Sequence, residues 1–170
     1  MKQLLLAFSL LFMTLSFGQK EMVVDAFETF SSNVGAKMRI MKSPEYLLTF
    51  SGETEMVDRI SWELADNTLH IWSTTPNMDF RTVEVTVYTP SITAVALTYG
   101  GILTMDGAFS QIENFEISAI EGATADLSNI DFKNLVAKAL HGGEILYKST
   151  RTLISSTDEE GVIKRSDGIN

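Results

Sequence analysis

The sequence predicts an all-β protein in which N-terminal antiparallel strands lead into a short right-handed β-solenoid of three to four coils. Two observations predict this fold. Apolar and polar residues alternate in short runs broken by turn residues up to Pro90, and glycine-marked segments recur after it. The chain has 170 residues, of which 45% are hydrophobic and 21% charged, as expected for one packed domain. We therefore expect a single β domain over residues 19–170.

Residues 1–18 have the features of a cleaved signal peptide. Lys2 supplies a positive charge, and the apolar run from Leu4 to Phe17 is shorter than the roughly 20 residues that span a bilayer. Ser16 and Gly18 place small residues where a signal peptidase recognises them, so cleavage is expected after Gly18. A retained membrane anchor is the alternative. After cleavage we expect no transmembrane anchor and a location in the periplasm, the outer cell envelope or the extracellular space.

Charge and cysteine content exclude several classes of protein. The chain has 13 Lys and Arg against 22 Asp and Glu, a formal net charge of −9. Nucleic acid is not an expected partner, because affinity for it comes mostly from clustered basic residues on phosphates. The same charge disfavours docking on anionic lipid. Because there is no cysteine, disulfides, iron–sulfur clusters and thiol catalysis are excluded, and stability must come from the core.

Residues 19–90 have the pattern of an antiparallel meander. A turn pair at Asp66-Asn67 joins two alternating runs and predicts a hairpin. Residues 53–58 favour a single helical turn. Trp62 alternates in phase with apolar neighbours and is predicted to lie in the core. The residues predicted to face inward are Met38, Ile40, Ile60, Leu64, Leu69, Ile71, Val83, Val85 and Val87.

Residues 91–163 contain glycine-marked repeats, followed by a polar tail over 164–170. The marker glycines, spaced by 22, 20 and 19 residues, are Gly100, Gly122, Gly142 and Gly161. A period near 20 with small residues at one phase predicts stacked coils, since small residues let the chain turn or let coils approach closely. The meander would cap one end of the stack. A plain antiparallel sandwich is the alternative, and Leu135 to Leu140 could locally form a helix.

These features resemble a family of exported bacterial proteins described as putative auto-transporter adhesin, head GIN domain. The resemblance runs from about Ala26 to Ile163. It rests on the opening strands Phe27 to Phe30 and Gly35 to Ile40, the hairpin Asp66 to Ile71, and the strand Val83 to Pro90 after which the repeats begin. It implies a β-rich, partly solenoidal fold and an exported location, and no established activity. The corners depart from the Ser-Gly-Ser-Gly type of the family, and its closing motif is missing after Lys164.

The sequence contains no motif that predicts catalysis or a cofactor. His70 and His141 stand apart from other metal-ligand residues, so no metal site is predicted. Nucleotide-binding glycine loops and the Gly-x-Ser-x-Gly elbow are also missing, and no cofactor is expected. Structural calcium at residues 158–160 is an alternative to a solvated acidic end.

Aromatic residues are the best indication of a binding surface. Trp72 shares a face with His70, while Tyr99 and Tyr147 fall near predicted corners, and aromatic rings provide large contact areas. We expect a non-enzymatic, adhesin-like module of the cell envelope or surface that binds a glycan or an envelope protein. One alternative is a polysaccharide-active enzyme, which a set such as Glu63, Glu84 and Arg81 around one pocket would favour. A purely structural envelope component, which would self-associate, is the other.

Overall fold

The structure is a computed structural model that describes residues 17–75 and 78–166. In these residues the regular structure is almost entirely strand, which confirms the all-β prediction. The elements are β1 (Phe17–Val23), β2 (Thr29–Ser32), β3 (Lys37–Lys42), β4 (Leu47–Glu53), α1 (Thr54–Val57), β5 (Ile60–Ala65), β6 (Thr68–Ser73), β7 (Glu84–Thr89), β8 (Ala94–Leu97), β9 (Ile102–Met105), the 3-10 turn η1 (Gly107–Phe109), β10 (Gln111–Ile120), β11 (Thr124–Leu140), β12 (Glu144–Thr157) and β13 (Val162–Arg165).

The expected signal peptide lies mostly outside the described residues. Phe17 and Gly18, the last two residues before the expected cleavage point, begin β1 opposite Glu53 and Gly52 of β4. Within 17–75 and 78–166, no helix has the length and apolar character that a membrane crossing requires.

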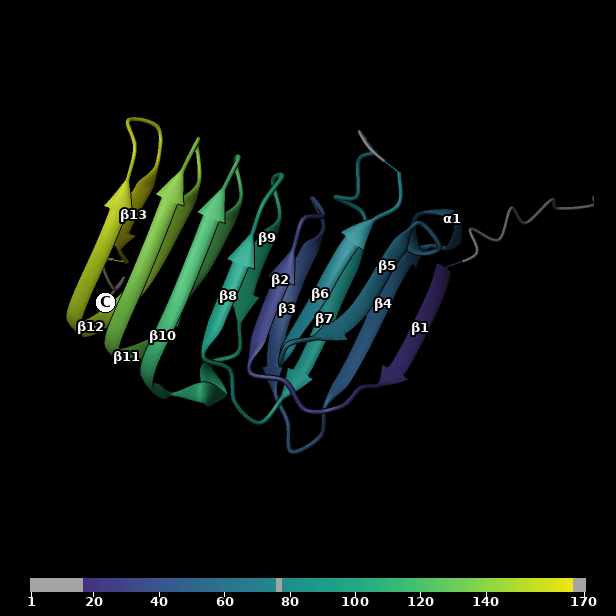
Figure 1. Cartoon of the computed structure of the whole chain (residues 1–170), viewed down its shortest axis with the longest axis horizontal. Helices are drawn as coiled ribbons and strands as arrows, with labels where there is room; N and C mark the ends of the chain where they lie inside the picture. The colour runs from purple at the N-terminus through teal and green to yellow at the C-terminus, as the bar shows by residue number, and fades with distance from the viewer. Residues whose placement is uncertain (1–16, 76–77, 167–170) are drawn as a thin grey trace, which may run out of the picture.

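All described strands belong to one mixed sheet of 13 strands. The sheet curls so that two walls face each other, with β2, β6, β8 and β10 in one wall and β3, β7 and β9 in the other (Figure 1). The long strands β11 and β12 contribute to both walls, since the first part of β11 pairs with β9 and its later part pairs with β10. β1 lies at one end of the stack, and β12 and β13 lie at the other (Figure 1).

The back half is a stack of parallel strands in register. Equivalent residues of successive strands are offset by 22, 20 and then 18 positions on both walls. On one wall these residues are Ala94, Glu116, Val136 and Ile154; on the other they are Ile102, Thr124, Glu144 and Val162. Parallel pairing excludes the plain antiparallel sandwich. The helical alternative for Leu135 to Leu140 is also wrong, because these residues end β11.

The prediction of an antiparallel meander over 19–90 is only partly right. The pairs β1–β4, β4–β7 and β5–β6 are antiparallel, but β2 is parallel to β6 and β8, and β3 is parallel to β7 and β9. Alternation shows which face of a strand is buried but not the direction of its neighbours, which explains the error. The predicted hairpin is confirmed: Asp66 and Asn67 have φ values of 49° and 62° between β5 and β6. The helical turn is confirmed as α1.

Two-residue corners with positive φ connect the walls in the back half. Tyr99–Gly100 has φ values of 54° and 73°, and Glu121–Gly122 and His141–Gly142 repeat this geometry. Glycine adopts positive φ readily, which explains its recurrence at the second position. Gly161, taken as the fourth marker, instead aligns with Gly143, since Val162 lies opposite Glu144.

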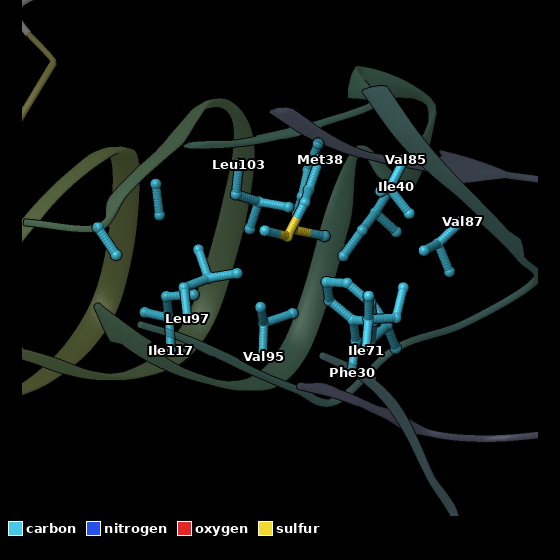
Figure 2. Close-up of a cluster of buried hydrophobic side chains, with 14 of the residues drawn as sticks. Phe30, Met38, Ile40, Ile71, Val85, Val87, Val95, Leu97, Leu103 and Ile117 are labelled. Carbon is cyan, nitrogen blue, oxygen red and sulfur yellow. The ribbon is translucent and has the colours of Figure 1, made fainter. Parts of the chain in front are cut away.

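Alternating side chains from the two walls fill the space between them. Phe30, Val95 and Ile117 point inward from one wall and Met38, Ile40 and Leu103 from the other (Figure 2). All six side chains are at most 2% exposed. Such alternation is expected wherever one face of each strand is buried.

Trp62 was predicted to lie in the core but is only half-buried. It packs against the core from its rim, and its Nε1 lies 3.1 Å from Sδ of Met22 on β1. Its strand β5 is at the sheet edge, where the partner strand covers only one side. Period-2 alternation does not reveal whether a strand is central or at an edge.

Asp158 holds the last corner together. Its carboxylate accepts hydrogen bonds from the backbone N–H groups of His141 at 2.8 Å, Gly161 at 2.8 Å and Glu160 at 3.2 Å. These N–H donors hold the pKa of Asp158 below its ordinary value, and the N–H of His141 has the largest effect. Both carboxylate oxygens accept backbone N–H groups, so the side chain stabilises the backbone of this corner. Among the described residues, no group of three His, Asp or Glu side chains is arranged to hold a metal ion.

Replacing Asp158 with asparagine is expected to reduce stability at pH 7 and to weaken its pH dependence. Because the folded pKa is lowered, Asp158 stabilises the fold above the ordinary aspartate pKa of about 3.9, and this contribution is lost as the pH falls through the folded pKa. Urea unfolding of the wild type and Asp158→Asn at pH 7 and pH 3, in dilute protein, measures the effect. The difference in unfolding free energy should shrink at pH 3, and a constant difference would contradict the assignment. Glu121→Gln, at another corner, is the control.

Candidate binding cleft at the corners

A cleft lies where three connections between the two walls meet. Its volume is about 790 Å³. Three chain segments line it: the β2–β3 connection, the β6–β7 connection and the β8–β9 corner. The lining residues, all in the described part of the chain, are Asn33, Val34, Gly35, Ser73, Thr75, Met78, Asp79, Phe80, Arg81, Tyr99 and Gly100.

Gly35 allows two of these segments to come together. A Cβ added at this residue would lie 2.8 Å from the carbonyl oxygen of Tyr99, closer than any real Cβ contact. The β2–β3 connection therefore packs directly under the corner that carries Tyr99. The absence of a side chain at Gly35 is what permits this close backbone approach.

The β6–β7 connection is anchored before and after the cleft. Phe80 is 3% exposed and inserts into the core, and its carbonyl accepts the N–H of Val83 at 2.8 Å. Upstream, the N–H of Thr74 donates to the carbonyl of Arg59 at 3.0 Å. Ser73 Oγ accepts the N–H of Thr75 at 3.0 Å, which shapes a local turn. The polar cleft residues thus come from anchored backbone.

Asp79 and Arg81 form a bidentate ion pair at the cleft. Arg81 Nε lies 3.0 and 3.1 Å from the two carboxylate oxygens, and Nη2 donates to Oδ2 at 2.7 Å. The side-chain hydrogen bonds from Arg81, followed by its backbone N–H, lower the pKa of Asp79 to about 2. The same pair raises the pKa of Arg81. Both groups are therefore charged at neutral pH. Together they offer hydrogen-bond donors and acceptors, and their charges of opposite sign cancel.

This arrangement suits recognition better than acid–base catalysis. A general base works best with a pKa near the operating pH, and that of Asp79 is far below it. Glycoside hydrolysis commonly needs two carboxyl groups, whereas Asp79 is the sole carboxylate among the described lining residues. Of the set that would favour an enzyme, only Arg81 reaches the cleft; Glu84 instead pairs with Arg39 at 3.3 Å.

Of the four residues predicted to form a binding surface, the structure places only Tyr99 in the cleft. Its side chain is 62% exposed. His70 and Trp72 are half-buried on β6, opposite Glu63 and Ser61 of β5. Tyr147 is half-buried and packs against the core on β12. The cleft does not bring these three residues together with Tyr99.

Asp79 was not among the predicted site residues, and Arg81 was considered only with Glu63 and Glu84 as part of an enzyme site. Asp79 and Arg81 flank the buried Phe80 in a connection between two strands, so two opposite charges separated by one apolar residue were the available signal. Asn33, Ser73 and Thr75 gave no signal, since they are ordinary turn residues. That these residues line one cleft depends on which connections between strands meet at the corners.

The fold is an all-β domain built on one mixed sheet, and connections between its strands line a solvent-facing cleft. The family described as putative auto-transporter adhesin, head GIN domain, matches residues 26–165. The chain belongs to this family, as its sequence resemblance predicted. No curated protein is detectably similar to it in sequence.

Solved structures share the fold at low sequence identity. A putative adhesin from Bacteroides fragilis superposes with a TM-score of 0.70 and 12% identity over 88% of this chain and 75% of its own. A putative lipid binding protein from Parabacteroides distasonis gives 0.75 and 15% over 88% and 65%. A putative adhesin from Parabacteroides merdae gives 0.66 and 10% over 82% and 58%. The chain thus spans less than two thirds of the last two proteins.

Proposed function

We propose that the protein is an exported, non-enzymatic interaction module of the cell envelope whose corner cleft binds carbohydrate. The observation that carries the proposal is the exposed ring of Tyr99 in the same cleft as the ion pair of Asp79 and Arg81. An aromatic face stacks on the apolar face of a sugar, and paired charged groups offer donors and acceptors to its hydroxyls. The location, in the periplasm or at the outer envelope, is supported by the family and by the apolar N-terminal run.

We also infer that the parallel stack is a short right-handed β-solenoid. Its support is the equal offset of 22, 20 and 18 residues on both walls. Parallel strands joined through a crossover are right-handed in about 98% of cases, and β8 and β10 are parallel neighbours joined through β9. Because hydrogen bonds between the stacked strands hold each corner in place, binding there orders fewer protein groups. This favours binding by reducing the entropy lost on association.

Tyr99→Asn is expected to weaken glycan binding by about tenfold, or about 1.4 kcal/mol. Asparagine tolerates the positive φ of this corner, so the variant removes the ring while retaining the backbone. Binding to a panel of immobilised bacterial polysaccharides, measured by biolayer interferometry, gives the affinities. Tyr99→Phe keeps the ring and should bind like the wild type. Glu121→Asn makes the matched change at the next corner, with φ 56°, and should also bind normally.

Two results would overturn the cleft assignment. One is folded wild-type protein that binds no polysaccharide above background. The other is an equal loss of affinity in Tyr99→Asn and Glu121→Asn, which would place the ligand elsewhere. Binding to phospholipid vesicles is measured in a separate experiment. Binding to vesicles without binding to polysaccharide would replace carbohydrate with lipid as the ligand.

A further inference from the structure

The end of the stack formed by β12 and β13 is an open sheet edge. Among the described residues, Ser149–Thr157 of β12 pairs only with β11, and β13 pairs only with β12. Residues 151–157 are all exposed, whereas the aligned part of β11 buries alternate residues. Backbone N–H and C=O groups along this edge therefore face outward and can pair with another strand.

The opposite end of the stack is covered differently. There α1 contacts β1 and β4, and its Val57 is 2% exposed. Trp62 of β5 reaches Met22 of β1, and Lys20 pairs with Asp58 at 2.6 Å. Side chains thus bridge the two walls at that end. The β12–β13 end has no such cover in the described chain.

The middle of the open edge has the composition of a pairing strand. Residues 152–157 contain no charge and no proline, and three of the six are β-branched. Ile154 is 63% exposed, Leu153 38% and Val162, on the other wall, 44%. Covering these side chains would remove apolar surface from water while satisfying the backbone groups beside them.

Charges of opposite sign lie at the two ends of this edge. The corner carries Asp158, Glu159 and Glu160, and the other end carries Arg151 and Arg165. Within the described residues, no ion pair engages Arg151, Glu159 or Glu160, although each is exposed. Ion pairs between adjacent strands, such as Lys148 with Asp131 at 2.8 Å, already occur inside the stack.

Two twofold arrangements can join this edge to the same edge of a second copy. An axis along the strands would place the two acidic corners against each other. An axis perpendicular to the walls would pair β12 with β12 and β13 with β13 in antiparallel directions. It would also place each acidic corner beside the basic end of the other copy, twice per dimer. Charge complementarity therefore selects the second arrangement.

We infer that the β12–β13 edge binds a second copy of this chain, with antiparallel strand pairing across a twofold axis perpendicular to the walls. Centring the β12 pair on Ser155 sets Arg151 of each copy opposite Glu159 of the other, so opposite charges face each other at both ends of the paired segment. The cleft with Tyr99 lies at corners nearer the other end of the stack, so dimerisation and glycan binding can be measured separately.

Sedimentation equilibrium of the chain tests this inference. We expect a dimer of the 18.8 kDa chain, less the signal peptide where it has been cleaved, that dissociates progressively as salt rises, because exposed charge pairs are screened. Ile154→Lys should weaken dimerisation by about tenfold or more while leaving the melting temperature of the monomer nearly unchanged, since this side chain is 63% exposed.

Charge reversal distinguishes this arrangement from a general loss of pairing. Arg151→Glu and the double variant Glu159→Lys/Glu160→Lys should each weaken the dimer, and the triple variant should restore it. Glu121→Lys changes a corner away from the edge and should have no effect. A folded wild type that stays monomeric at high micromolar concentration and low salt would overturn the inference. A dimer that is insensitive to Ile154→Lys, or is not restored in the triple variant, would do the same.

Discussion

Replacing Gly143 with alanine is expected to destabilise the protein by about 3 kcal/mol. A Cβ at this position would lie 2.0 Å from the carbonyl oxygen of Ala119 and 2.7 Å from its carbonyl carbon. Both are backbone atoms of β10, the strand next to the last part of β11, so no side chain can rotate to make room. The overlap between the added Cβ and the Ala119 backbone can be relieved only if adjacent strands move apart, which weakens the hydrogen bonds between them.

Gly142→Ala is the matched control for this prediction. Gly142 has φ 77°, and its added Cβ would meet nothing closer than 3.9 Å. Its expected cost is therefore only about 1–2 kcal/mol from the positive φ. Urea unfolding and thermal melts of both variants give the comparison, with a melting temperature for Gly143→Ala lower by roughly 6–12 °C. Equal costs would show that corner conformation, rather than close strand approach, selects glycine at position 143.

Phe30→Ala is expected to cost about 3–5 kcal/mol. The Phe30 side chain is fully buried, and it lies opposite Leu69 and Val95 on the two neighbouring strands of its wall. Its ring projects between the walls in Figure 2. Truncation would leave a cavity between the walls, and the hydrogen bonds within each wall hold its strands in place, so the site cannot collapse fully to fill it.

Val23→Ala is the control for Phe30→Ala. Val23 is 85% exposed on β1, and the expected change is within about 0.5 kcal/mol. The unfolding free energies come from urea titration, with the slope checked for a shared two-state transition. A cost below about 1 kcal/mol for Phe30→Ala would mean that the walls close around the missing ring. The inward rows of side chains would then be less rigid than the structure shows.

Several parts of the fold could be predicted because they depend on neighbours in the sequence. The hairpin at Asp66–Asn67 follows from two residues that tolerate positive φ between alternating runs. The glycine-marked corners follow from the same local preference, and their spacing near 20 residues predicted the stacked strands. The family itself was identifiable because these local features occur in a fixed order along the chain.

Other parts could not be predicted from local patterns. β2 and β3 have the same alternation as antiparallel strands, yet they pair in parallel with strands far away in sequence. Trp62 alternates like a core residue but lies on an edge strand. For the candidate site, the pattern indicated Tyr99 as a binding residue and Arg81 only as part of an enzyme set, and it gave no role to Asp79. His70, Trp72 and Tyr147 were also named, and the cleft does not include them.

The all-β class, three of the corners and the inward side of most strands could be predicted from the sequence, because φ preference and apolar alternation act over a few residues. Which strands became neighbours, and which connections met at the cleft, emerged only in the folded chain. That the β12–β13 edge remains open among the described residues emerged there as well. These outcomes depend on pairing between distant segments, for which many partners with the same alternation compete, and the packing of the complete core selects among them.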